Sequence, residues 1–90
     1  MLNKVKAALR ITVDLYNLEL SSLIDAALAD LGLVGINDDK LVETDSLVSM
    51  AVITYCRMRF GSPSDYDKLK ASYDEQKAQL ISATGYGLEV

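Results

Sequence analysis

The 90-residue sequence predicts an all-α fold, a small four-helix domain, on three observations. Apolar residues recur with helical spacing in four separate segments. Residues that favour helix ends (aspartate, serine, proline and glycine) stand at the boundaries of these segments. The stretch 33–44 has no helical period and is expected to be a loop. A chain this short has room for one core, so we expect one helical domain over residues 1–84 and a flexible tail over 85–90.

The first predicted helix covers residues 2–10 and carries a narrow apolar stripe. It ends where the β-branched run 11–13 interrupts the helical pattern. A second helix is expected over 15–31, with Asp14 as its N-cap because a carboxylate accepts hydrogen bonds from free amides of the first turn. Gly32 is the expected residue after its end, because glycine adopts the left-handed conformation at little cost.

The second predicted helix has apolar residues on two faces. A wide face is expected to meet the core: Tyr16, Leu20, Leu23, Ile24, Ala27, Leu28 and Leu31. At 100° per residue the opposite face carries Leu15, Leu18, Ser22 and Ala29. An ordinary surface helix would carry charges there, so this face predicts a partner surface. The alternative is that the first helix folds back to cover Leu15 and Leu18.

The loop over 33–44 contains the turn-forming residues Asn37, Asp38 and Asp39. We expect a plain loop pinned to the core by Ile36 or Leu41, with a minimal β-hairpin as the less favoured alternative. The acidic cluster lacks the glycine and the ligand spacing of a calcium loop, so it predicts a solvated turn.

A third helix is expected over 46–60, capped by Thr44 or Asp45, and it ends at Gly61. This segment is apolar nearly all round, which predicts the central, most buried helix of the domain. The fourth helix is expected over 63–83, with Ser62 as cap and Pro63 in its first turn. Its predicted inner stripe comprises Tyr66, Leu69, Tyr73, Leu80 and Ile81.

The sequence offers no support for an enzyme. It contains no histidine, which is the usual general base and the commonest metal ligand. Cys56 is the only cysteine, has no activating partner in sight, and lies in an apolar run typical of a core. No phosphate-binding glycine loop or metal-ligand spacing is present. We therefore predict no catalytic residues, no metal and no cofactor.

The formal net charge of −4 argues against a protein that coats nucleic acid. The basic residues Lys4, Lys6 and Arg10 are nevertheless concentrated at the N-terminal end, before the first acid. They leave open an alternative function as a small DNA-binding or DNA-packaging accessory protein. No secretory signal and no apolar stretch long enough to cross a membrane is recognised, so we expect a protein that acts or assembles inside a cell.

The order of the motifs resembles the head–tail connector (adaptor) family of long-tailed bacteriophages and prophages. The segments that carry the resemblance are "VKAALRIT", an aspartate-capped helix with Leu20, Leu23-Ile24 and Ala26-Ala27, the apolar "SLVSMAVITYCRMRFG", and "YDKLKASYDEQKAQL". The resemblance implies an all-α virion subunit, present in the host cytoplasm during assembly. It also implies a ring of about a dozen copies beneath the portal protein.

In that family the ring continues the DNA channel without binding DNA sequence-specifically, and it receives a stopper or tail-completion protein. We predict Leu15, Leu18 and Ser22 as subunit contacts. The resemblance places the C-terminal segment near the portal, so Tyr86, Leu88 and Val90 are predicted as portal-docking residues. A third hypothesis is a generic four-helix adaptor of a bacterial complex.

Overall fold

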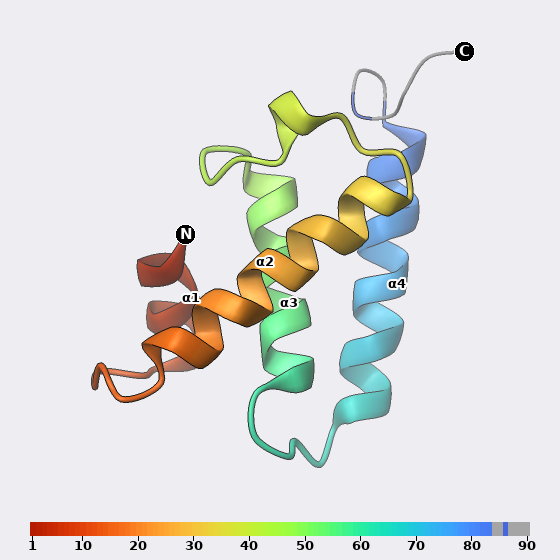
Figure 1. Ribbon diagram of the computed structural model, residues 1–90. Helices are drawn as coiled ribbons and strands as arrows, with labels where there is room; N and C mark the ends of the chain where they lie inside the picture. The colour runs from red at the N-terminus through yellow and green to blue at the C-terminus, as the bar shows by residue number, and fades with distance from the viewer. Residues whose placement is uncertain (84–85, 87–90) are drawn as a thin grey trace.

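The computed structural model describes residues 1–83 and Tyr86. The described chain forms four α-helices and a short 3₁₀ turn, which confirms the all-α prediction (Figure 1). The elements are α1 (Leu2–Leu9), α2 (Asn17–Leu33), η1 (Asp38–Lys40), α3 (Ser46–Arg59) and α4 (Tyr66–Ser82). Apart from Tyr86, the predicted tail over 85–90 lies outside the described residues.

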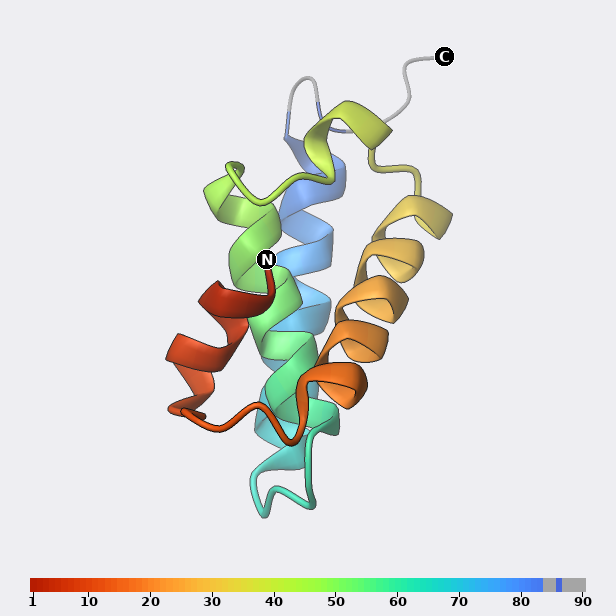
Figure 2. The ribbon, with the colours of Figure 1, turned by 60° about the vertical axis from the view of Figure 1, so that its left-hand side comes forward.

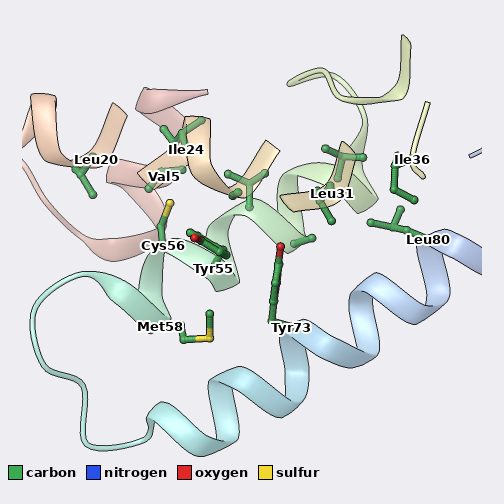
Figure 3. Packing of buried hydrophobic residues seen from close by; sticks show 14 residues of the cluster. Val5, Leu20, Ile24, Leu31, Ile36, Tyr55, Cys56, Met58, Tyr73 and Leu80 are labelled. Atoms are coloured by element: carbon green, nitrogen blue, oxygen red, sulfur yellow. The ribbon is translucent and has the colours of Figure 1, made fainter. Parts of the chain in front are cut away.

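Helix α3 is the centre of the domain, as its composition predicts. It packs against α1, α2 and α4, and it runs between them in both ribbon views (Figures 1 and 2). Val48, Val52 and Cys56 are fully buried on it. The other core residues come from all four helices and the loop before α3 (Figure 3): Val5, Leu20, Ile24, Ala27, Leu31, Ile36, Ala51, Tyr55, Met58, Tyr73 and Leu80.

Helix α1 ends in a left-handed turn, where the β-branched run predicts a break. Arg10 adopts φ 60° and ψ 39°, and its amide donates to the carbonyl of Ala7 at 3.2 Å. The amide of Ile11 donates to the carbonyl of Lys6 at 2.9 Å, which completes a Schellman-type ending. Glycine usually occupies this position, because a side chain in the left-handed region costs about 1–2 kcal/mol.

Helix α2 begins and ends two residues later than predicted, and Asp14 is not its N-cap. The Asp14 carboxylate binds Lys6 Nζ at 2.8 Å, so α1 uses the group that was expected to cap α2. The N-cap position is instead Tyr16, whose ring packs edge-on against Phe60 with centroids 5.3 Å apart. At the other end Gly32 remains helical, and the left-handed residue is Gly35 at φ 97°.

A loop joins α2 to α3, as predicted, and the hairpin alternative is wrong. Leu33 belongs to α2, and Asp38–Lys40 form the 3₁₀ turn η1. Ile36 is 3 % exposed, and the partly buried Leu41 packs against the core, so both predicted anchors hold the loop down.

Helix α3 begins where predicted, because Asp45 Oδ1 accepts a hydrogen bond from the amide of Val48 at 3.0 Å. Gly61 follows its end with φ 70°. Helix α4 starts at Tyr66, so Ser62 is not its cap and Pro63 is not in its first turn. The chain reverses direction between α3 and α4 (Figure 1), and the residues up to Asp65 make that connection rather than extending the helix.

The strained ending of α1 gives a stability prediction. Replacing Arg10 by glycine should raise the free energy of unfolding by about 0.5–1 kcal/mol, because glycine tolerates the left-handed conformation. Denaturant titration followed by circular dichroism measures the change. Arg10→Ala is the matched control, since it removes the same side chain without relieving the backbone. An equal gain in both variants would show that the charge, not the conformation, is responsible.

Candidate interaction surfaces

The outer face of α2, defined as Leu18, Ser22, Ala26, Ala29 and Leu33, is exposed along the whole helix. Leu18 is 87 % exposed and Leu33 is 85 % exposed. At 100° per residue, four of the five (all except Ala26) fall within a sector of roughly 60°. Asp25 borders this sector about 20° outside it. Large apolar side chains at both ends and small ones between them make a surface suited to close approach by another helix.

Leu15 lies just before α2 and is 79 % exposed. The alternative in which α1 covers Leu15 and Leu18 is therefore wrong. Helix α1 instead buries Val5 completely, in the common core that contains α3. The three predicted subunit-contact residues, Leu15, Leu18 and Ser22, all remain open to solvent in the single chain.

A groove between α3 and α4 forms a second apolar surface, which we call the α3–α4 groove. It has a volume of about 210 Å³ and is lined by Leu47, Met50, Gln76, Gln79 and Leu80. Met50 is 55 % exposed on one wall, whereas Leu80 is buried at its base. The sequence indicates that the third helix is buried on most sides, but its nearly continuous apolarity does not show which side stays open, so this groove was not located.

Gln76 gives the groove one unsatisfied polar atom. Its side-chain oxygen is buried and accepts no hydrogen bond from the part of the chain that the structure describes. A buried acceptor without a donor costs about 1–3 kcal/mol. A partner that fills the groove and supplies a donor would recover that free energy.

The basic N-terminal residues do not form one patch. Lys4 Nζ donates to the carbonyl of Glu43 at 2.8 Å, whereas Lys6 Nζ binds Asp14 at 2.8 Å. Two residues apart on a helix, these lysines lie about 160° from each other around its axis. Arg10 is exposed at the left-handed end of α1. A role for these three residues in DNA contact stays a prediction.

Tyr86, which falls in the predicted flexible tail, is half-buried and hydrogen-bonded to the domain. Its hydroxyl donates to Asp45 Oδ2 at 2.7 Å, and its carbonyl accepts from the amide of Asn37 at 2.6 Å. Lys40 Nζ lies 5.5 Å from the centre of its ring. Leu88 and Val90, the other predicted docking residues, lie outside the described residues. Portal docking by all three stays a prediction.

Comparison with protein families identifies the family of the chain. The family described as phage connector protein matches residues 1–87, which is nearly the whole chain. The chain belongs to the phage connector family. Neither curated proteins nor solved structures give a significant match.

Family membership makes this connector a structural component of the virion that associates with other head or tail proteins. Such a role is generally not enzymatic. Within the described residues, no helix of the connector is both long and apolar enough to cross a membrane.

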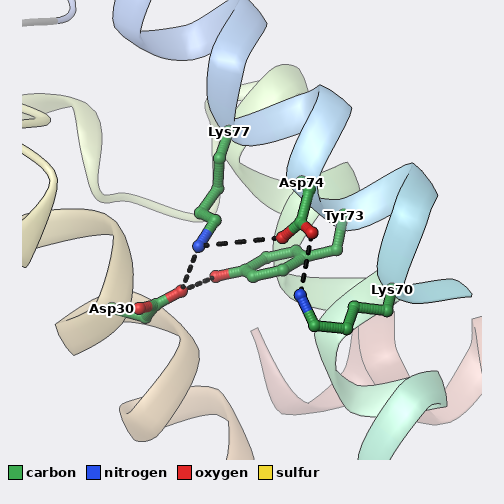
Figure 4. Close-up of polar contacts among 5 residues, drawn as sticks. All are labelled: Asp30, Lys70, Tyr73, Asp74 and Lys77. Atoms are coloured by element: carbon green, nitrogen blue, oxygen red, sulfur yellow. Dashed lines mark hydrogen bonds and ion pairs between the residues drawn. The ribbon is translucent and has the colours of Figure 1, made fainter. Parts of the chain in front are cut away.

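A polar cluster of the connector lies between α2 and α4 (Figure 4). Asp30 Oδ2 accepts from the hydroxyl of Tyr73 at 2.6 Å and from Lys77 Nζ at 3.2 Å. Burial by itself would raise the pKa of Asp30, but the hydrogen bonds from Tyr73 and Lys77 outweigh it and hold the pKa below its usual value. Asp74 pairs with Lys70 at 2.8 Å beside this cluster.

This cluster ties two helices of the connector together. Burial and the Asp30 carboxylate raise the pKa of Tyr73, so its hydroxyl stays protonated and acts as a donor. Burial also raises the pKa of Cys56 to about 11, which leaves its thiol unreactive at neutral pH. No group of residues suited to a metal ion occurs in the described part of the connector.

Asp30 makes the stability of the connector depend on pH. The pKa of Asp30 in the folded protein lies below the unfolded value near 3.8. At a pH between these two values the folded state therefore binds fewer protons than the unfolded state. The stabilisation is complete above the unfolded pKa and is lost as the pH falls through the folded pKa. In Asp30→Asn the free energy of unfolding should therefore decrease less steeply than in the native protein as the pH falls below about 4.

The measurement is a series of denaturant titrations between about pH 2 and pH 7, which spans both pKa values. Tyr73→Phe is the companion variant: it keeps the carboxyl group but removes one hydrogen bond, so its profile should lie between those of the native protein and Asp30→Asn. Identical acid profiles for all three proteins would show that the Asp30–Tyr73 contact contributes nothing to the pH dependence.

Proposed function

We propose that this connector is the head–tail adaptor that assembles into a ring beneath the portal vertex. In this role copies of the chain continue the DNA channel and present a surface for a stopper or tail-completion protein. The observation that carries the proposal is the largely apolar, uncovered outer face of α2. Copies packed side by side through Leu15, Leu18 and Ser22 would bury it.

The energetics favour association through this face. Fully burying a leucine side chain stabilises by about 1.5–3 kcal/mol. Leu15, Leu18 and Leu33 are each at least 79 % exposed. The three small residues between Leu18 and Leu33 lose little side-chain entropy when a neighbour approaches. A monomer gains nothing from exposing this line of residues, whereas an assembled subunit gains from burying it.

The charge of the chain fits a conduit for DNA. With a net charge of −4 on each copy, a ring would not hold the phosphate backbone strongly. Two of the N-terminal cations already have partners inside the chain, in Glu43 and Asp14. DNA would therefore pass through the ring without sequence-specific binding.

The C-terminal segment is the proposed contact with the portal. Tyr86 fixes its starting point beside the N-terminus of α3, through Asp45 and Asn37. Leu88 and Val90 follow two and four residues later and supply apolar side chains for docking.

Subunit contact through the outer face of α2 is tested with Leu18→Asp. The substitution should leave the helical circular dichroism spectrum unchanged, since Leu18 is 87 % exposed, but should abolish ring formation. Electron microscopy and sedimentation of the protein, alone and mixed with its portal, measure assembly. Ala71→Asp, at an exposed alanine on α4, is the matched control and should assemble normally. Rings of Leu18→Asp indistinguishable from native ones would refute the assignment of this face.

The docking role of the tail is tested by removing residues 87–90. The truncated protein keeps Tyr86 and its contacts, so its thermal midpoint should stay within a few degrees of the native value. Its binding to the portal in a pull-down should be lost. Because Tyr86→Phe removes only the hydrogen bond to Asp45, it separates an effect of the anchor from an effect of the tail. Undiminished portal binding by the truncated protein would rule out docking through Leu88 and Val90.

A further inference from the structure

We propose that the α3–α4 groove receives the outer face of α2 from the next copy of the chain. The subunits would then join head to tail, each with its α2 face in the groove of its neighbour. This inference rests on the proposed ring and specifies which two surfaces of the chain meet in it.

The position of the two surfaces suits a head-to-tail contact. The outer face of α2 points away from the core, whereas the groove lies on a part of α3 and α4 that α2 does not cover. Both are present on every copy, on different flanks. A contact between two different surfaces of identical chains is heterologous, and it closes into a ring when its rotation allows.

The size of the groove favours side chains over a small-molecule ligand. Its volume of about 210 Å³ is below the roughly 300–1,000 Å³ typical of ligand pockets. A dry cavity of about 150 Å³ in another protein holds a benzene molecule, so this groove has room for a leucine side chain. Leu47, Met50 and Leu80 would surround such a side chain with apolar atoms.

The unsatisfied oxygen of Gln76 specifies what must accompany that leucine. A hydrogen-bond donor next to an apolar group would suit the groove, because Gln76 lines it and its side-chain oxygen is buried without a donor. The outer face of α2 provides this pair: Ser22 lies one helical turn after Leu18 and is exposed. Its hydroxyl could donate to Gln76 once that side chain turns its buried oxygen toward the groove, while Leu18 fills the groove.

The acidic residues of α2 favour this head-to-tail arrangement over a symmetrical packing of two α2 faces. All charged residues of α2 are acidic: Glu19, Asp25 and Asp30. Two α2 faces packed against each other would bring Glu19 and Asp25, which flank the outer face, towards the same acids of the partner. Like-charge repulsion opposes that packing.

The groove presents no such repulsion in its lining, because none of its five lining residues carries a charge. Lys68 lies eleven residues before Gln79, so it continues the same wall further along α4. Glu75 is exposed and lies about 40° from Gln79 around α4, on the side away from Gln76, so it is outside the lining of the groove. The groove therefore suits an acidic helix better than a second acidic helix face would.

Disulfide trapping tests the contact in the full-length protein. An equal mixture of Leu18→Cys and Met50→Cys, oxidised at rising protein concentration with and without the portal, should give a mixed dimer. Its yield should exceed the homodimers of either variant several-fold. Cys56 can stay in place, because it is fully buried and its raised pKa of about 11 keeps the thiol protonated. Leu18→Cys with Ala71→Cys is the matched control.

Each outcome decides the question. A preferred homodimer of the Leu18→Cys variant is the signature of symmetrical packing and would overturn the inference. An intramolecular disulfide in a Met50→Cys, Leu88→Cys double variant, with no mixed dimer, would assign the groove to the end of the same chain. Rings that form without the mixed dimer would contradict the head-to-tail contact but not the proposed function. If neither rings nor cross-links form, even with the portal, the proposed function is overturned as well.

Discussion

The packing of three helices around α3 is the constraint on which the rest of the structure depends. A helix contacted by α1, α2 and α4 can be apolar on most of its surface, and Val48, Val52 and Cys56 are fully buried on it. The same arrangement leaves each surrounding helix with one covered face. Because α2 has apolar residues on two faces, this fold necessarily exposes one of them, and Leu18 and Leu33 are the result.

Polar contacts hold the edges of this arrangement. Asp45 uses one oxygen to cap α3 and the other to accept from Tyr86, so one carboxylate holds both the start of the central helix and Tyr86. Asp30 connects α2 to α4 through Tyr73 and Lys77, although α2 and α4 make little direct contact. These links orient α2, and thereby the direction in which its outer face points.

The sequence predicts the helices well because apolar periodicity reports burial, and α3 and the apolar second face of α2 follow from it directly. That this face stays exposed does not follow, because α1 could have folded back over Leu15 and Leu18. It predicts helix starts poorly where a capping residue has a competing partner. Asp14 is a good N-cap by type, but Lys6 lies within reach and binds it. The α3–α4 groove could not be predicted, because periodicity assigns Leu47 and Met50 to a buried helix without showing that its neighbours leave one side open. Nor does any local pattern reveal that Asp30 meets Tyr73, 43 residues away.

The exposed face of α2 also bears on how assembly is controlled. The proposed pairwise contact centred on Leu18 and Ser22 would be small, and a net charge of −4 on each copy would oppose association in solution. Such a contact would be weak between two free subunits. In a head-to-tail ring the last contact forms within one assembly, so its effective concentration is high and closure adds stability without a new kind of interface. A portal that gathers copies raises the local concentration in the same way. A weak contact between two subunits, combined with a stable closed ring, would keep the subunits apart until the portal gathers them.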